Sequence, residues 1–263
     1  MEQSSGAGPR SAVVVGGASG IGWATAQRLA TDGWRLVVAD IDTAAAEERA
    51  RSLPGGAVET HRAAHVDVVD EASVEALLTS AGADGTLQLV VNCAGVSTMG
   101  LVVEHDAAEW RRVVDVCLNG GFLVVKHAGQ HLAEGGSVVS VASLNARQPG
   151  VGMGAYCAAK AGLVMLTEVA ALELGPRGIR VNAVSPGLVP TPLTAPALDI
   201  PGIEDDYLEN TPLGRSGSTE EVAEAIAYLA DAHWVTGTNL DINGGAHLKR
   251  YPDIHGHVMR AFS

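Results

Sequence analysis

A tyrosine and a lysine stand four residues apart as Tyr156 and Lys160. On a helix this spacing places both side chains on one face. An unperturbed tyrosine has a pKa of about 10, and a nearby ammonium favours the phenolate and lowers that value. The pair therefore predicts a general acid or base that works near neutral pH. Ser143 precedes the pair, at the end of an apolar run, and its hydroxyl could bind the same substrate oxygen as Tyr156.

Three glycines form a second candidate site. Gly16, Gly20 and Gly22 directly follow the apolar run Ser11–Val15 and open a helical stretch. Glycines permit a tight turn and close approach of the backbone to a pyrophosphate. The start of a helix adds free N–H groups and a partial positive charge. A glycine triplet between a strand and a helix is the context that dinucleotide binding requires, so we expect a dinucleotide here.

An acid follows the second apolar run, where it could select the dinucleotide. Asp40 lies 18 residues after Gly22, near the spacing typical of the acid that binds the adenosine ribose. A carboxylate there accepts hydrogen bonds from the ribose hydroxyls and repels a 2′-phosphate. No Lys or Arg occurs within residues 11–27 or 36–48 to bind such a phosphate. The sequence therefore predicts NAD rather than NADP.

Short apolar runs alternate with longer helical stretches along the chain. The expected strands are Ser11–Val15, Arg35–Ala39, Leu87–Val91, Ser137–Val141, Ile179–Val184, Thr238–Ile242 and a weaker Ala57–Ala63. The expected helices are Ile21–Thr31, Thr43–Arg51, Glu71–Ala81, Ala107–Leu132, Ala155–Leu174 and Thr219–Ala230. This alternation predicts an α/β fold, a single-domain Rossmann-type doubly wound sheet of about seven parallel strands with helices on both faces. Ligands of such sheets bind at the carboxyl ends of the strands.

Composition excludes several classes of function. The chain has 263 residues with 17 Lys and Arg against 30 Asp and Glu, a formal net charge of −13. Nucleic acid and anionic membranes both need a basic face, so neither is expected as a partner. No apolar run approaches the roughly 18 residues of a membrane helix, since Glu168 breaks the best candidate, Ala161–Leu174. Three cysteines without a CxxC pair favour a reducing, cytoplasmic setting.

The motifs together resemble the classical short-chain dehydrogenase/reductase family over roughly residues 11–246. The order and spacing of several segments carry the resemblance. They are Gly16, Gly20 and Gly22, Asp67-Val68, Asn92-Cys93-Ala94-Gly95, Asn119, Ser143, Tyr156 and Lys160, Pro186-Gly187 with Thr191, and Asn243-Gly244-Gly245.

The resemblance implies a mechanism and a residue set. Tyr156 would exchange a proton with the substrate oxygen, which Ser143 would orient. Lys160 would hold the nicotinamide ribose and lower the pKa of Tyr156, and Asn119 would anchor a water in a proton relay. Hydride would pass between the substrate and the nicotinamide. The implied cofactor-binding residues are Gly16, Ser19, Gly20, Ile21, Gly22, Asp40, Ile41, Asp67, Val68, Asn92, Ala94, Gly95, Tyr156, Lys160, Pro186, Gly187, Val189 and Thr191.

The expected domain layout is simple. Residues 1–10 form a flexible N-terminal tail, residues 11–246 the catalytic domain, and residues 247–263 a C-terminal tail. Within the domain, the proline-containing residues 188–212 sit where the family places a substrate lid, and long irregular segments of compact domains are often lids. The acidic core of this lid, Ile203–Glu209, is expected to be a solvated helix face. If its acids faced the pocket, they would disfavour anionic substrates.

The expected substrate is a small neutral carbonyl compound or alcohol. The substrate pocket would be formed by Ser143, Asn145, Met153, Tyr156 and Leu188, a largely apolar set with few polar groups. Substrates within the family vary with the lid sequence while the catalytic set stays fixed, so the residues do not name the substrate.

Histidines and apolar helices raise questions of metals and subunits. His127 and His131 have a spacing that could bind a metal, but no third ligand is evident nearby, so we expect packing and no metal site. His247, His255 and His257 lie in the C-terminal tail, which we expect to be ordered against a neighbouring subunit. The family resemblance implies a homotetramer.

Three functions fit these residues. The first is an NAD-dependent oxidoreductase that interconverts a secondary alcohol and a ketone. The second is a 3-oxoacyl-thioester reductase with the same fold and a larger, anionic substrate; most such enzymes use NADPH, against which Asp40 argues, and basic residues beside the active-site mouth would favour it. The third is a dinucleotide-binding protein without turnover. The intact Ser143, Tyr156, Lys160 and Asn119 argue against the third.

Overall fold

The computed structural model describes residues 10–54 and 61–262. The expected N-terminal tail, residues 1–10, lies outside these residues except for Arg10. The first part of the expected strand Ala57–Ala63 also lies outside them.

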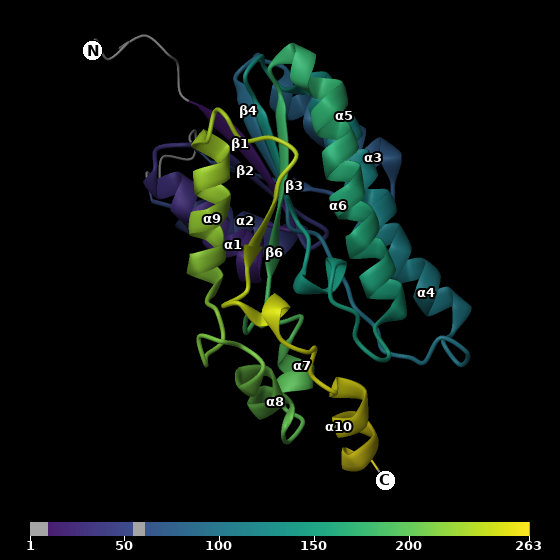
Figure 1. Cartoon of the computed structure of the whole chain (residues 1–263). Helices are drawn as coiled ribbons and strands as arrows, with labels where there is room; N and C mark the ends of the chain where they lie inside the picture. The colour runs from purple at the N-terminus through teal and green to yellow at the C-terminus, as the bar shows by residue number, and fades with distance from the viewer. Residues whose placement is uncertain (1–9, 55–60, 263) are drawn as a thin grey trace.

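Within the described residues, seven parallel strands form one sheet in the order β3-β2-β1-β4-β5-β6-β7 (Figure 1). The strands are β1 (Ser11–Val15), β2 (Arg35–Asp40), β3 (Arg62–His65), β4 (Leu87–Asn92), β5 (Ser137–Val141), β6 (Arg180–Pro186) and β7 (Asn239–Ile242). The strand order reverses beside β1, between β1 and β4. The fold class expected from the sequence, a doubly wound Rossmann-type sheet, is confirmed.

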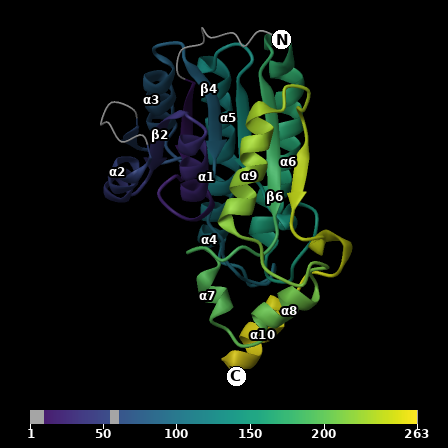
Figure 2. The same ribbon diagram turned by 90° about the vertical axis from the view of Figure 1, so that its left-hand side faces the viewer.

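Helices cover both faces of the sheet, as Figure 2 shows from the side. They are α1 (Gly20–Thr31), α2 (Thr43–Ser52), α3 (Glu71–Gly82), α4 (Ala107–Val114), α5 (Gly120–His131), α6 (Gly154–Leu174), α7 (Ala195–Leu198), α8 (Ile203–Glu209), α9 (Thr219–Asp231) and α10 (Ile254–Ala261). The expected helix Ala107–Leu132 is two helices, α4 and α5, joined by a π-helical turn at Asp115–Asn119. The short α7 and α10 were not expected from the sequence, whereas α8 is the segment expected to be a solvated helix face.

Two apolar cores lie on opposite faces of the sheet because successive strand side chains point to opposite sides. Ala12 and Val14 of β1 pack in the core that α1 and α9 cover. Val13 and Val15 pack in the core beneath α3, α5 and α6. Both faces of β1 are fully buried, so its sequence is an unbroken apolar run rather than an alternating one.

The N-termini of the helices differ in whether side chains cap their first backbone N–H groups, which decides where a ligand can bind such groups. The start of α9 is closed by a capping box, in which Ser218 and Glu221 satisfy each other's backbone N–H groups. Asp106 closes the start of α4 by accepting from two backbone N–H groups. Ser19, at the start of α1, makes no such side-chain bond. The first N–H groups of α1 therefore stay open to a bound anion.

Helix α6 has an apolar composition that corrects one expectation from the sequence. Together with the turn after it, Gly154–Arg177, it is long and apolar enough to cross a membrane, with a mean hydropathy of 1.4. The expectation that no segment reaches that length is therefore wrong. Residues Leu163, Ala170 and Ala171 of this helix are buried in the fold. Length and composition alone are weak evidence for a membrane span, because a core helix passes the same test.

Candidate active site

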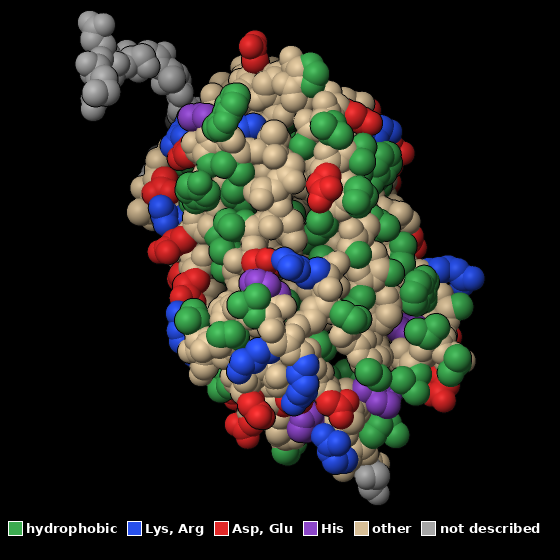
Figure 3. Space-filling view, in the orientation of Figure 1, with side chains coloured by type: hydrophobic (Ala, Val, Ile, Leu, Met, Phe, Trp, Pro, Cys, Tyr) green, Lys and Arg blue, Asp and Glu red, His purple; other side chains and the backbone are tan. Residues whose placement is uncertain are grey.

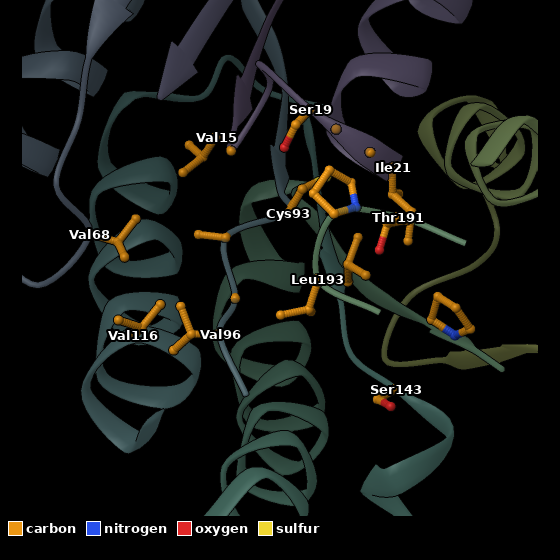
Figure 4. Close-up of a pocket in the computed structure, with 18 of the residues that line it drawn as sticks. Val15, Ser19, Ile21, Val68, Cys93, Val96, Val116, Ser143, Thr191 and Leu193 are labelled. Carbon is orange, nitrogen blue, oxygen red and sulfur yellow. The ribbon is translucent and has the colours of Figure 1, made fainter. Parts of the chain in front are cut away.

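A cleft of about 350 Å³ opens at the carboxyl ends of the central strands. Figure 4 shows Ser19 and Ile21 facing Thr191 and Leu193 of the lid, with Ser143 at the other end. The cleft is lined by residues from the glycine turn, from the ends of six strands (β1 to β6), from the π-helical turn, from α6 and from the lid, namely Val15, Gly16, Ser19, Gly20, Ile21, Gly22, Asp40, Ile41, Val66, Asp67, Val68, Cys93, Ala94, Gly95, Val96, Val116, Val141, Ala142, Ser143, Tyr156, Lys160, Pro186, Gly187, Val189, Thr191, Pro192, Leu193 and Thr194.

The glycine turn leaves no room for side chains. A Cβ on Gly22 would lie 2.0 Å from the carbonyl oxygen of Gly16. Gly16 itself has a φ of 71°, and a Cβ there would lie 3.0 Å from the backbone nitrogen of Ala94. A Cβ on Gly20 would lie 3.3 Å from the side chain of Thr191. The turn thus presents bare backbone to the cleft and brings the lid within contact of it.

Asp40 is fixed at the end of β2 by backbone N–H groups. Its carboxylate accepts from the N–H of Ala18 at 3.0 Å and from that of Asp42 at 3.1 Å. Arg49 follows directly after residues 36–48, the range that contains no Lys or Arg. Its Nε donates to the carbonyl oxygen of Ala18 at 3.2 Å, and its guanidinium lies 4.8 Å from the ring centroid of Trp23. Lys160 is the sole cation among the residues that line the cleft.

Tyr156 and Lys160 occupy one face of α6, as their spacing predicted. The Lys160 ammonium is 3% exposed, donates to the carbonyl oxygen of Val141 at 2.7 Å and lies 5.6 Å from the ring centroid of Tyr156. Ser143 follows β5, and its Oγ accepts the N–H of Asn145 at 3.1 Å. An ammonium has three donors, so Lys160 keeps two for other partners.

The pKa of Tyr156 is shifted in the direction opposite to the lowering by Lys160 that the sequence led us to expect. Burial raises the pKa of Tyr156 well above its ordinary value, although a hydrogen bond with Ser143 acts in the opposite direction. Burial also lowers the pKa of the Lys160 ammonium. The physical reason is that desolvation disfavours the charged form of both groups, and the ammonium is directed at Val141 rather than at the phenol.

Asn119 is part of the π-helical turn between α4 and α5. Its side chain is exposed and donates to the carboxylate of Asp115 at 2.8 Å. It does not belong to the residues that line the cleft. The water relay expected from the family resemblance would therefore have to run along the backbone of this turn, and it stays a prediction.

Several predicted residues lie behind the cleft wall rather than in it. Asn92 is 3% exposed, and its amide oxygen accepts the N–H of Ala94 at 3.2 Å. It therefore holds the backbone of Ala94, which lines the cleft. Asn145, Met153 and Leu188, expected to contact substrate, are all buried and do not line the cleft. The side-chain amide of Asn145 is bonded to Gln148 and Tyr251, and contact of these three residues with a substrate stays a prediction. The other predicted cofactor-binding residues all line the cleft.

The acids of α8 do not line the cleft. Glu204, Asp205 and Glu209 are exposed, as expected for a solvated helix face. Asp206 is the exception, because it is 8% exposed and pairs with Arg250 of the C-terminal tail at 2.6 Å. Figure 3 shows charged and histidine side chains gathered over this end of the molecule. The tail, expected to lie against another subunit, contacts the lid of its own chain.

Two tyrosines near the substrate end were missed. The hydroxyl of Tyr207 in the lid is hydrogen-bonded to the hydroxyl of Tyr251 in the tail at 2.7 Å. Tyr251 also donates to the amide oxygen of Asn145 at 3.1 Å. The sequence carries no motif for this pair, since 44 residues separate the two tyrosines.

Three of the histidines considered as metal ligands in the sequence each lie beside a different residue. His127 lies 3.4 Å from Glu71, His131 bonds Thr79 at 3.2 Å, and His257 lies 3.3 Å from Asp206. Across residues 10–54 and 61–262, no three His, Cys, Asp or Glu side chains gather in a way that could hold a metal.

Comparison with known proteins identifies relatives over nearly the whole chain. A family model described as enoyl-(acyl carrier protein) reductase matches residues 16–247. The chain is 42% identical over 245 residues to cis-4-hydroxycyclohexanecarboxylate dehydrogenase of Sinomonas cyclohexanicum, covering 90% of the chain and 96% of that protein. It is 37% identical over 248 residues to (3R)-3-hydroxyacyl-CoA dehydrogenase of Homo sapiens, covering 89% and 94%. A solved short-chain type dehydrogenase/reductase from Mycobacterium ulcerans superposes with a TM-score of 0.91 at 32% identity, covering 96% and 95%.

Proposed function

The chain belongs to the short-chain dehydrogenase/reductase family, and we propose that it oxidises a secondary alcohol to a ketone with NAD, and catalyses the reverse reduction. One observation carries the proposal. The glycine turn and the Ser143–Tyr156–Lys160 group lie at opposite ends of one cleft, so a dinucleotide bound at the first would extend toward the second. Enzymes of this family use a nicotinamide dinucleotide, and the cleft fits one.

The cleft would hold the dinucleotide largely through backbone atoms of the glycine turn. The positions of Gly16 and Gly22 leave no space for a Cβ, and the open N–H groups at the start of α1 suit a pyrophosphate. Asp40 offers a carboxylate where an adenosine ribose would lie, which favours NAD over NADP. Arg49 contacts Ala18, whose backbone N–H binds the Asp40 carboxylate, and its guanidinium already bonds the Ala18 carbonyl oxygen and lies over the Trp23 ring.

At the substrate end of the cleft, Tyr156, Ser143 and Lys160 would each have a separate role in the reaction. A bound NAD would supply the acceptor for the hydride of the carbinol carbon. Tyr156, in its phenolate form, would take the hydroxyl proton and become the phenol, so that the alcohol loses one hydride and one proton and becomes the ketone. Ser143 Oγ accepts the N–H of Asn145, so its own proton is the donor that can bind either the Tyr156 oxygen or the substrate oxygen. Lys160 has two donors free for the nicotinamide ribose.

A 3-oxoacyl-thioester reductase is the second candidate, favoured by the human relative that is a 3-hydroxyacyl-CoA dehydrogenase. Such a substrate carries phosphates that need cations at the mouth of the site. Three basic residues flank the substrate end, and each has a protein partner. Arg147 bonds Asp241 at 2.6 Å, Arg250 bonds Asp206, and Lys249 donates to the carbonyl oxygen of Glu209 at 2.7 Å. This pairing favours a small neutral substrate, the class expected from the sequence.

The chain is proposed to act as a homotetramer in the cytoplasm, without nucleic acid or membrane as partner. Met165, Val169 and Leu172 form an exposed apolar stripe on α6, and Phe122 is exposed on α5. A stripe of this kind on neighbouring helices suits burial against another copy of the chain. The net charge of −13 disfavours polyanionic partners.

The test is an assay of the purified chain with NAD or NADP and a panel of secondary alcohols, together with a 3-hydroxyacyl-CoA. We expect NADH to form with neutral secondary alcohols, and little product with NADP. Because the pKa of Tyr156 is raised, the rate of alcohol oxidation should climb as the pH rises above neutrality. Turnover of the thioester alone, or a preference for NADP, would refute the proposal.

A further inference from the structure

The C-terminal tail holds the chain segment that begins with Ser143. This segment, residues 143–150, follows β5 and is named the Ser143 turn. The side-chain amide of Gln148 in the turn donates to the carbonyl oxygens of Ala246, at 3.3 Å, and of Lys249. Figures 1 and 2 both show the chain after β7 passing to the end of the molecule that holds α8. The tail therefore lies at the substrate end of its own chain.

Tyr251 of the tail contacts the Ser143 turn at two places. Its hydroxyl donates to the amide oxygen of Asn145 at 3.1 Å. Its ring lies against the backbone of Gly150, where an added Cβ would come within 2.5 Å of a ring carbon. The first contact is a hydrogen bond and the second is packing. A Tyr251→Phe variant therefore loses the first contact and keeps the second.

Asn145 connects Tyr251 to Ser143. Its backbone N–H donates to Ser143 Oγ at 3.1 Å, and its side-chain nitrogen donates to the carbonyl oxygen of Gln148 at 3.1 Å. Asn145 is 6% exposed, and a hydrogen bond in such a setting is stronger than one in water. The residue that donates to Ser143 is thus held at both ends of its own side-chain amide. The proton of Ser143 is left for the Tyr156 oxygen or the substrate oxygen.

The hydroxyl of Tyr251 remains a donor throughout the pH range of an assay. Burial raises its pKa to about 12, so the phenol does not ionise near neutrality. Because Tyr251 gives its one proton to Asn145, the bond of 2.7 Å with the Tyr207 hydroxyl uses the proton of Tyr207. Removal of the Tyr207 hydroxyl therefore leaves the bond between Tyr251 and Asn145 in place.

We propose that Tyr251 is a positioning residue, which acts through Asn145 to fix the Ser143 hydroxyl where it can bond the Tyr156 oxygen and the substrate oxygen. The inference rests on the proposed function, since it assigns a role in the same reaction. Tyr251 does not line the cleft, so its effect is on kcat and not on cofactor binding. The hydrogen bond with Ser143 favours the phenolate of Tyr156, so a loosened Ser143 leaves Tyr156 harder to ionise.

The experiment compares wild type with Tyr251→Phe, Tyr207→Phe and the control Tyr228→Phe, whose side chain is exposed on α9. Values of kcat and of KM for NAD are measured against pH with a secondary alcohol that wild type oxidises. Tyr251→Phe should lower kcat by about threefold to tenfold and leave KM for NAD unchanged. The pH of half-maximal kcat should rise by roughly half a unit, because Tyr156 loses part of a bond that favours its phenolate. Tyr207→Phe and Tyr228→Phe should keep the wild-type kcat and pH profile.

A double-mutant cycle tests whether the effect passes through Asn145. Asn145→Ala should itself lower kcat, and Tyr251→Phe should add no further loss in that background, because residues of one hydrogen-bonded chain are not additive. All variants keep the other titratable groups that act on Tyr156, namely Lys160, Cys117 and Cys157.

Three outcomes would overturn the inference. The first is a wild-type kcat in Tyr251→Phe, or a lower kcat with an unshifted pH profile, as a merely less stable fold would give. The second is an equal loss in Tyr207→Phe. The third is a full further loss when Tyr251→Phe is added to Asn145→Ala.

If wild type oxidised no alcohol, the proposed function would fail by itself. The role of Tyr251 would then be judged by hydrogen exchange of the Asn145 amide, which donates to Ser143. Exchange should be faster in Tyr251→Phe than in wild type and Tyr207→Phe. Equal exchange in all three would contradict the positioning role.

Discussion

The two ends of the cleft are held together by different kinds of contact. At the cofactor end, the glycine turn, the start of α1 and the N–H groups around Asp40 are backbone features, placed by neighbouring parallel strands. At the substrate end, side chains fasten the lid to the tail, with Asp206 and Tyr251 at the centre. Short motifs therefore specify the first end, whereas the second depends on pairs of residues far apart in the chain.

Removing the Tyr156 hydroxyl should have the largest effect. Tyr156→Phe should lower kcat by roughly 10²- to 10⁴-fold, the usual contribution of a general acid or base. NADH binding, followed by fluorescence titration, should persist because the cofactor end is untouched. Tyr228→Phe, an exposed tyrosine, serves as control. Undiminished turnover in Tyr156→Phe would rule out the assigned role.

Filling the glycine turn should damage the cofactor end alone. In Gly22→Ala the new Cβ would meet the carbonyl oxygen of Gly16 at 2.0 Å, so backbone must shift. We expect NADH affinity to fall at least about tenfold, since overpacking typically costs about 1–3 kcal/mol. Gly175→Ala is the control, because nothing lies within 4 Å of a Cβ there. Wild-type affinity in Gly22→Ala would show that the turn does not contact the cofactor.

Removing the carboxylate of Asp40 should change the choice of cofactor. In Asp40→Ala we expect kcat/KM for NADP relative to NAD to rise about tenfold, because the repulsion of a 2′-phosphate is gone. In Asp40→Ala combined with Arg49→Gln the gain should shrink, since Arg49 is the cation bonded beside the glycine turn. Glu48→Gln, an exposed acid on α2, is the control. An unchanged cofactor ratio in Asp40→Ala would remove the basis for NAD selection.

The smallest effect is expected from unfastening the tail. Burial acts to raise the pKa of Asp206, but hydrogen bonds from Arg250 and the Asp253 N–H outweigh it and hold that pKa below its ordinary value. The stabilisation is therefore complete at neutral pH and disappears as the pH falls through the lowered pKa. Asp206→Asn should lower Tm at pH 7 by roughly 2–6 °C, with the difference closing in acid.

The control for this variant is its neighbour on the same helix. Asp205→Asn, at an exposed position, should leave Tm unchanged. A pH-independent difference between wild type and Asp206→Asn would contradict a stabilising ion pair.

The strands and the cofactor end could be predicted well because the signals are local. The Val-rich strands β1, β5 and β6 are buried on both faces, and the glycines stand between a strand and a helix. The π-helical turn that divides Ala107–Leu132 into two helices was not predicted from the sequence. Helix α10 was missed because its eight residues follow an irregular segment and are held by contacts with the lid.

The sequence by itself determined the doubly wound sheet, the glycine turn and the face of α6 that carries Tyr156 and Lys160, since each strand, the turn and the helix face leave a local pattern in the chain. Tertiary structure alone decided that Asp206 is buried and that Tyr251 reaches Asn145. It also decided that Tyr156 is partly buried, and this burial raises its pKa. Desolvation and pairing over tens of residues depend on how the whole chain packs, and no local pattern encodes them.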